Sequence, residues 1–358
     1  MDITATHNQT TAHTGKITDH LNLRDDHSER LTSAELANLW ADFMSSKLKE
    51  CVVRYFLEKV EDEEVRSVLE YALHIAKQHV QTISGIYSRE NHPLPQGFTD
   101  EDVRVNAPRL FSDAFILSYM EFMAEMRISG YSTALPMTAR ADIREYFTGC
   151  MASATELYNR TASVLLARGL YLRAPQIPIP ERFDFVKRQN FLAGFLGDRR
   201  PLTSIEISHI FSGTKTGFLR KALLTGYAQT AKSQPVRDYM IRGRAIASKS
   251  VKILSSLLTE NGLPMPAAWD SGVLQSTVAP FSEKLMVHNI GVFNAVEFKN
   301  YGKAISVTLR RDLTASFTRL MAELGKHTTD GINLLIDAGW LEEQPQSKGT
   351  ESLKKKMH

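Results

Sequence analysis

Apolar residues recur every three or four positions after Thr32, and this spacing predicts a long helix buried along one side. A second stretch with the same period follows the acidic residues 61–64 and ends before Asn91. Two further stretches follow, so the first part of the chain reads as four helices. Their apolar stripes are Leu36, Trp40, Phe43, Cys51 and Leu57; Val65, Val68, Ala72, Ile75, His79, Ile83 and Ile86; Phe111, Phe115, Ser118, Phe122 and Met126; and Ile143, Phe147, Cys150, Ala154, Leu157, Thr161 and Leu165.

This four-helix pattern occurs twice along the chain. Residues 31–35 (LTSAE) align with residues 202–206 (LTSIE), and the offset of 171 holds for 68 positions. After one deletion, a second block continues at an offset of 170 to Gly169 and Gly339, where the last helix of each copy should stop. Each block holds 13 identical pairs, whereas chance would give roughly 8 in total. We infer an internal duplication of a whole domain, because the period is far longer than that of a solenoid repeat.

Both copies begin with the same helix-start signal. Thr32-x-x-Glu35 and Thr203-x-x-Glu206 are capping boxes, in which a hydroxyl and a carboxylate pair with backbone amides left free in the first helical turn. The acidic run at residues 61–64 suits the positive end of a second helix.

A long connection separates the second and third predicted helices of each copy. It spans about 15 residues and contains Pro-x-Pro at Pro93 and Pro95, which is more than a tight turn between antiparallel helices needs. One long crossover at this place is typical of ferritin-like bundles. The predicted fold is therefore all-α, with two tandem ferritin-like four-helix bundles related by internal duplication.

The pattern divides the chain into five parts. We expect a disordered segment at residues 1–29, the first bundle at 30–170, an apolar linker at 171–200, the second bundle at 201–345 and a basic tail at 346–358. The linker contains FDFVKRQNFLAGFLG and should pack between the two bundles.

Charge and cysteine content argue against a nucleic-acid-binding protein and against a secreted, disulfide-bonded one. The net charge is +3 and three lysines lie in the tail, so nucleic acid is not an expected partner. Only Cys51 and Cys150 occur, without zinc-site spacing, which favours a reducing cytoplasm. The sequence shows neither a signal peptide nor a membrane-spanning run. We expect a cytoplasmic protein that contacts no membrane; the sequence names no partner and is compatible with a homo-oligomer.

Several motifs in order resemble the bacterial family called domain of unknown function 3231. They are LTSAELANLWADFM, KVEDEEVRSVLEYAL, NHPLPQGFTDEDVRVNAPRLFSD, IPIPERFDFVKRQNFL and RRDL, and the similarity covers about residues 30–345. The resemblance implies a ferritin-like fold and an origin in Bacillus or related spore-formers, with no assigned reaction. It also implies a histidine in the middle of the second helix of both repeats; this chain has His79 in the first and Ser250 in the second.

His79 is the leading candidate for chemistry, because it falls in the centre of an apolar stripe where an unpaired polar group is costly. Helix levels predict Glu125 or Glu121 and Cys150 as its neighbours. One interpretation is a core histidine with a single hydrogen-bond partner. The other is a metal site formed by His79, Glu125, Glu121 and Cys150, with iron, zinc or manganese as the ion.

No phosphate-binding loop, nucleophile elbow, HExxH or calcium-binding loop is present, and neither repeat has the full di-iron set of glutamates and histidines. The repeated pairs Arg140/Asp142 and Arg310/Asp312 are interpreted as salt bridges at the start of the fourth helices.

The leading hypothesis is a non-catalytic structural or interaction protein of a spore-forming bacterium, associated with sporulation or the spore. The alternative is a ferritin-like metal-binding protein whose site is retained only in the first bundle. A third hypothesis is small-molecule binding in a bundle core or between the units, lined by Met120, Met123 and Met126.

Overall fold

The computed structural model describes residues 29–182, 185–195, 199–266 and 272–347. Within these ranges the regular elements are helices, together with two isolated β-bridges. The first unit consists of α1 (Ser33–Lys59), α2 (Glu63–Arg89), α3 (Asp113–Ala134) and α4 (Ala141–Ala167); the second consists of α5 (Ser204–Thr230), α6 (Gln234–Thr259), α7 (Glu283–Val307) and α8 (Arg311–Asp337). Short 3₁₀ helices are η3 (Asp100–Asp102), η4 (Leu135–Met137) and η5 (Gln189–Leu192).

The helices of the two units correspond one to one, which confirms the predicted all-α duplication. The bounds of α1 and α5 differ by 171 at both ends, and those of α4 and α8 differ by 170 at both ends. The change of offset falls in the crossover between α6 and α7. The largest difference is at the end of α3: η4, which contains Pro136, stands where α7 continues for three more residues.

Each capping-box glutamate also ties the first helix of its unit to the last. The backbone amide of Thr32 donates to Glu35 at 2.7 Å, which completes the predicted box at the start of α1. The same carboxylate accepts the amide of Arg140 at 2.8 Å. Glu206 repeats the arrangement with the amide of Arg310 at 3.1 Å. Because α1 and α4 begin at the same end of the bundle, one buried carboxylate satisfies amides at both helix starts.

The salt bridges predicted at the start of the fourth helices are present in both units. The Arg140 guanidinium lies 2.8 Å from Asp142, and that of Arg310 lies 2.7 Å from Asp312. Each arginine donates in addition to a backbone carbonyl that precedes the first helix of its unit, at 3.0 Å in both cases. The pair therefore fixes the chain entering the bundle as well as the start of the last helix.

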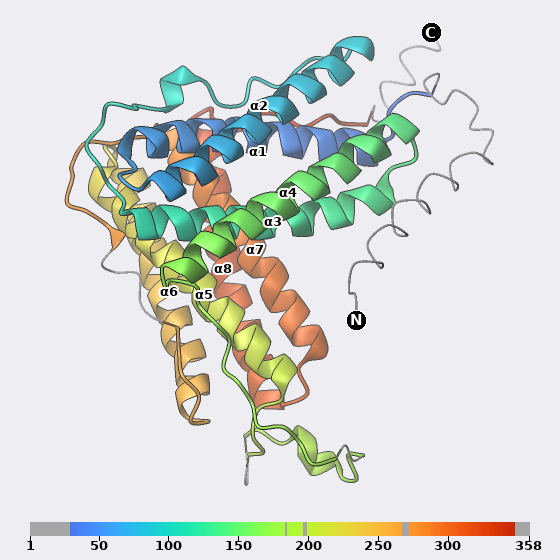
Figure 1. Cartoon of the computed structure of the whole chain (residues 1–358), viewed down its shortest axis with the longest axis vertical. Helices are drawn as coiled ribbons and strands as arrows, with labels where there is room; N and C mark the ends of the chain where they lie inside the picture. Colours follow the sequence, from blue (N-terminus) through green and yellow to red (C-terminus); the bar gives the residue numbers. More distant parts are fainter. Residues whose placement is uncertain (1–28, 183–184, 196–198, 267–271, 348–358) are drawn as a thin grey trace, which may run out of the picture.

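The two crossovers pair with each other across an approximate two-fold axis. Antiparallel bridges join Val103 to Phe281 and Phe111 to Val273, and the offset of 170 exchanges the two bridges. Near the axis, the Tyr119 hydroxyl donates a hydrogen bond of 3.0 Å to Asn289, which occupies the position of Tyr119 in the second repeat. One hydrophobic core runs through both units at this junction. Figure 1 shows the helices of the first unit lying across the top of the second bundle.

The linker does not pack between the bundles, so that prediction is wrong for its described part. Ile179 is 94% exposed and Phe185 is 91% exposed. Figure 1 shows the linker leaving α4, running beside α5 and projecting past the far end of the second bundle. The physical reason is direction: the linker begins with Tyr171 beside Lys215 in α5 and ends with Arg200 bound to Glu206 at the start of α5, so it follows the second unit away from the contact between the units.

The expected disordered segment at residues 1–29 and the basic tail at residues 346–358 lie outside the described residues, apart from positions 29, 346 and 347. Among the helices that are described, none combines the length and apolar character needed to cross a membrane.

Candidate functional site

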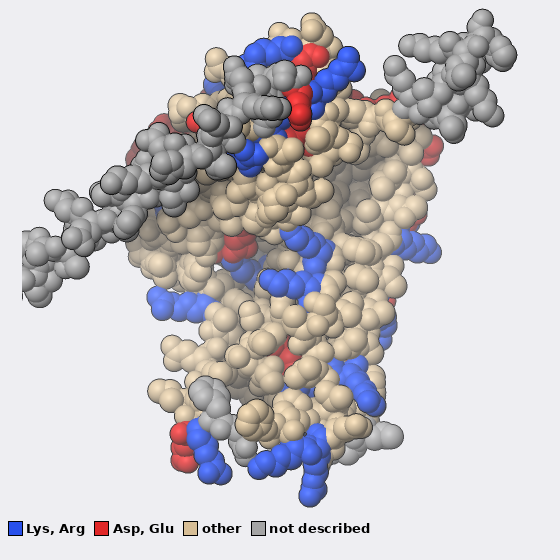
Figure 2. Space-filling model, turned by 90° about the vertical axis from the view of Figure 1, so that its right-hand side faces the viewer, with Lys and Arg blue, Asp and Glu red and all other residues tan. Residues whose placement is uncertain are grey.

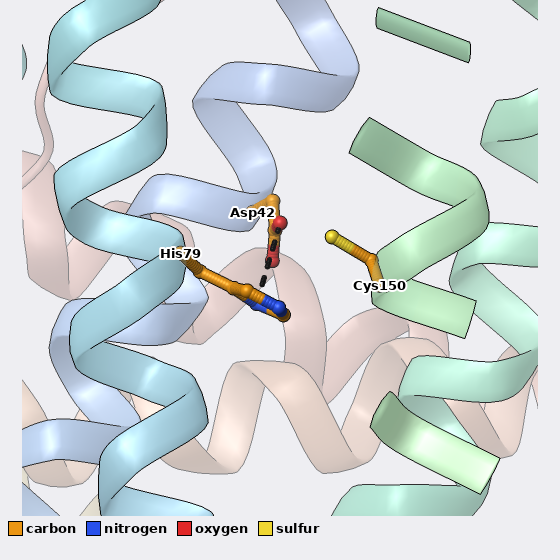
Figure 3. A group of neighbouring side chains, drawn as sticks. All are labelled: Asp42, His79 and Cys150. Atoms are coloured by element: carbon orange, nitrogen blue, oxygen red, sulfur yellow. Dashed lines mark ion pairs between the residues drawn. The ribbon is translucent and has the colours of Figure 1, made fainter. Parts of the chain in front are cut away.

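His79 projects from α2 into a group of polar side chains inside the first unit (Figure 3). It is 8% exposed, so the predicted burial is observed. Its Nδ1 lies 3.2 Å from the Tyr131 hydroxyl and 3.8 Å from a carboxylate oxygen of Asp42. The rings of Tyr131 and Tyr146 meet the imidazole edge-on, with centroids 6.0 and 5.9 Å away. The hydrogen-bond partner of His79 is thus a tyrosine of α3.

Asp42 of α1 is the centre of this group, and the sequence analysis did not identify it. The Tyr131 hydroxyl donates to Oδ1 at 2.9 Å, and the Tyr146 hydroxyl donates to Oδ2 at 2.6 Å. The Arg127 guanidinium forms a buried ion pair with Oδ1. A carboxylate with this many donors stays charged although it is buried.

The sequence does contain a signal for Asp42. Glu35, Leu39, Asp42, Ser46 and Lys49 recur every three or four residues, and all five are buried. They form a second stripe beside the apolar one, because α1 is covered on more than one side. Searching only for apolar positions hides this stripe.

Cys150 of α4 completes a set of ligand-type side chains. Its sulfur, an oxygen of Asp42 and a ring nitrogen of His79 all lie within 4.8 Å of one another, and all three residues are buried. Figure 3 shows the three side chains pointing toward one another from three different helices. The structure therefore brings together His79 and Cys150, as predicted, but with an aspartate in the place expected for a glutamate.

Glu121 and Glu125 point elsewhere. They lie 2.8 and 3.0 Å from the ammonium group of Lys215, which belongs to α5 of the second unit. This face of α3 packs against the other bundle, and spacing within one repeat cannot reveal that contact. The two glutamates join the units and do not reach His79.

Burial and the local charges set the protonation states of the group. Burial lowers the pKa of His79 to about 4, opposed by Asp42 and assisted by Arg127. Burial alone would raise the pKa of Asp42, but Arg127, His79 and the tyrosine hydroxyls hold it below its usual value. Burial raises the pKa of Cys150 to about 12. At neutral pH the group thus contains an aspartate anion, an arginine cation, a neutral imidazole and a thiol.

A second cation lies near this group. Burial lowers the pKa of Lys49 to about 7, with Arg127 contributing in the same direction and Asp42 opposing it. Asp42 therefore lies close to two basic side chains, Arg127 and Lys49.

The group borders a cleft of about 450 Å³ between the two units. Asp42, Arg127 and Tyr131 form part of its wall, and Val292, Val296 and Lys299 of α7 form part of the opposite wall. Met126 lines the cleft, as expected for a site between units, whereas Met120 and Met123 are buried in the core. Figure 2 shows the lysine and arginine side chains of one face dispersed over it.

Comparison with family models decides the relationship. The model of a family described as "Protein of unknown function (DUF3231)" matches residues 21–182 and, a second time, residues 190–353. The chain belongs to the DUF3231 family. Each unit is one copy of the family domain, which confirms the resemblance found in the motifs.

The chain was also compared with solved structures and with curated proteins. A solved structure titled "putative spore coat protein" from Bacillus halodurans C-125 is 15% identical, with a TM-score of 0.39, and the match covers 42% of this chain and 98% of that one. Among curated proteins there is no significant match.

The second DUF3231 repeat lacks all three of these ligand-type residues. The positions of Asp42, His79 and Cys150 are occupied by Gly213, Ser250 and Leu320. In their place the second repeat carries a different buried ion pair, in which Arg220 of α5 lies 3.0 Å from Glu297 of α7. In the first repeat the acid, Asp42, lies on the first helix and the base, Arg127, on the third. In the second repeat the base, Arg220, lies on the first helix and the acid, Glu297, on the third.

Proposed function

We propose that this protein binds a metal ion in its first unit through Asp42, His79 and Cys150, and that the second unit has no ion at the same level. The observation that supports the proposal most strongly is the convergence of these three side chains, from three helices, within 4.8 Å. Carboxylate, neutral imidazole and thiolate are the usual protein donors for transition metals. His79 is already in the form that binds, whereas the Cys150 thiol would release its proton when the ion binds. Of the three ions expected from the sequence, the donor set suits zinc and iron better than manganese, because it includes a cysteine sulfur.

Elemental analysis tests this proposal. Purified full-length protein is equilibrated with each ion in turn and freed of unbound metal, and the bound metal per chain is measured. We expect stoichiometric uptake of one of the ions, with loss in Asp42→Asn and His79→Ala.

The second unit supplies the matched control for this experiment. His327 is equally buried, and its Nε2 lies 3.1 Å from the carbonyl oxygen of Tyr239, so His327→Ala also removes a buried imidazole. That variant should keep its metal. Wild-type protein that takes up none of the three ions contradicts the proposal.

A second candidate is a non-catalytic structural or interaction protein in which the group of polar side chains serves only the fold. The observation that favours it is the number of donors at Asp42: both carboxylate oxygens are paired with protein groups without any ion. In this case His79→Gln should fold and bind no less metal than wild type. An association with sporulation or the spore would rest on the family resemblance alone.

For either function we propose a cytoplasmic or spore-associated location. The support is chemical: Cys51 and Cys150 are both buried free thiols. Free thiols of this kind are typical of a reducing compartment.

A further inference from the structure

We propose that the cleft between the two units binds an amphipathic carboxylate, a molecule with one anionic end and an aliphatic body, as in a medium-chain fatty acid. The inference goes beyond the proposed metal function and needs no bound ion. The cleft holds about 450 Å³, which lies within the range of small-molecule sites in proteins, about 300–1,000 Å³. Its walls come mainly from α1 and α3 of the first unit and from α5 and α7 of the second.

The cleft lies where the two units meet across their approximate two-fold axis, and both units line it with equivalent positions. An offset of 170 relates three residues of α3 to three of α7: Phe122 to Val292, Met126 to Val296 and Ser129 to Lys299. The cleft therefore exists only because the units pack against each other, and neither unit forms it alone.

Contacts between the units hold the walls of the cleft in place. The rings of Phe122 and Phe293 stack with centroids 3.9 Å apart. The ammonium group of Lys215 in α5 lies 3.0 Å from the carboxylate of Glu125 in α3. Because the walls are already fixed, a ligand loses less free energy to ordering of the site than in a cleft that must form on binding.

Most of the lining is apolar. Val292 and Val296 of α7 are half-buried, and so is Met126 on the opposite wall. An aliphatic chain between the two walls removes these side chains from water, which is favourable. The methionine side chain also adapts its shape to a flexible partner. The lining therefore fits the aliphatic body of the ligand.

Lys299 fits the anionic end, because it breaks the symmetry of the cleft. The equivalent position in the first repeat is the neutral Ser129. The Lys299 ammonium group is exposed and donates to the hydroxyl and the backbone carbonyl of Ser129, at 2.7 and 3.4 Å. Within residues 29–182, 185–195, 199–266 and 272–347, no carboxylate forms an ion pair with it. A ligand carboxylate can therefore serve as its counter-ion.

The other charged side chains in the wall of the cleft have protein partners. Glu125 shares Lys215 with the neighbouring Glu121, at 3.0 and 2.8 Å. Asp42 forms its ion pair with Arg127. The charge that is left for a ligand to neutralise is thus the positive one of α7, which favours a single anionic group over a cation.

The spacing along α7 sets the length of the ligand. Val292 and Val296 precede Lys299 on the same wall, and Val292 lies about 10 Å from Lys299 along the helix axis. A carboxylate at Lys299 can therefore lay an aliphatic chain of the length of octanoate along this row of residues.

Isothermal titration calorimetry of the full-length protein with octanoate tests the proposal, without added metal. We expect one octanoate per chain and weaker binding of octanol, which has the same chain length but no charge. Lys299→Gln should weaken the binding of octanoate by about tenfold or more and leave that of octanol unchanged, because a hydrogen bond to a charged group is lost. Lys299 is exposed, so this variant should fold normally.

Lys303 provides the matched control, because it is an exposed lysine of the same helix that does not line the cleft. Lys303→Gln should bind octanoate like the wild type. In protein with isotope-labelled methionine methyl groups, octanoate should shift the resonance of Met126 and leave that of Met265, which is 51% exposed and outside the cleft. Wild-type protein that binds no octanoate, an unchanged affinity in Lys299→Gln, or an unshifted Met126 resonance overturns the proposal. None of these results affects the proposed metal function, which is tested by metal content.

Discussion

Glu206 shows how much a single buried carboxylate contributes to this fold. It accepts two hydrogen bonds from the Arg200 guanidinium, both at 2.8 Å, and others from the amides of Thr203 and Arg310. Burial by itself would raise its pKa, but these hydrogen bonds and the charge of Arg200 lower the pKa to about 2. The ionised form is therefore favoured in the folded chain.

The pKa of Glu206 predicts an acid dependence of stability. The folded value lies below the unfolded one, so its contribution is fully present above about pH 5 and is lost as the pH falls toward about 2. Glu206→Gln should lower the free energy of unfolding by about 2–3 kcal/mol at pH 7. At pH 3 the loss should be roughly half as large, because the folded carboxylate is still mostly ionised there. Urea denaturation at both pH values measures this. Glu260→Gln is the control, since its ion pair with Arg199 is about half exposed and long, at 3.6 Å; equal losses in the two variants would contradict the prediction.

Single positions were predictable only where one stripe dominated a helix. The burial of His79 and the presence of Cys150 beside it follow from the clean apolar periodicity of α2 and α4. Asp42 was missed because α1 is buried on several sides. Glu121 and Glu125 were misplaced because their partner, Lys215, belongs to the other repeat. Periodicity reports that a face is covered and not what covers it.

At the scale of helices, a buried ion pair joins α5 and α7 inside the second unit. The side chains of Arg220 and Glu297 are 0% and 1% exposed, and Arg220 also donates to Asn294 at 2.9 Å. Burying such a pair is costly, but removing one partner costs more, because an uncompensated charge remains.

The ion pair between α5 and α7 gives a prediction by double-mutant cycle. Glu297→Met should lower the free energy of unfolding by about 3–5 kcal/mol, because Arg220 then stays charged and unpaired. Adding Arg220→Met should recover much of that loss, since both charges are then gone and the volume is kept. Chemical denaturation of the two single variants and the double variant measures the coupling. Strictly additive losses would mean that the two side chains do not act as a pair.

The number and order of the helices, and the starts of α1 and α5, were the most predictable features. Capping boxes fixed the starts of α1 and α5, and the two offsets placed the remaining helices by correspondence. The end of α3 was not predicted: η4, which contains Pro136, replaces the last turn found in α7.

At the scale of the whole molecule, the larger hydrophobic core extends through both repeats, and a smaller core lies within the second unit. Periodicity within a repeat could not predict the shared core. The rings of Phe122 and Phe293 stack with centroids 3.9 Å apart, and the bridges between the crossovers lie beside the junction. The packing of the linker was not predictable for a related reason: its apolar residues indicated burial, yet both of its ends are held along α5 and Ile179 and Phe185 remain exposed. Which surfaces two domains bury against each other depends on their full three-dimensional shapes.

A shared core predicts that the two units unfold together. Phe293→Ala removes a ring that is 0% exposed at the junction, at a cost of about 3–5 kcal/mol. Because Phe122 of the first unit loses its stacking partner, we expect one calorimetric transition for the variant as for the wild type, shifted to lower temperature as a whole. Phe298→Ala, on the same helix but 40% exposed, should shift the transition much less. If Phe293→Ala instead splits the transition into two peaks and only one moves, the units are independent domains and the contact between them adds little stability. The result also concerns the cleft between the units, whose two walls contain Asp42 and Val296. If the units unfold separately, the distance between these walls is free to change. If they unfold in one transition, the core that extends through both units holds the two walls together.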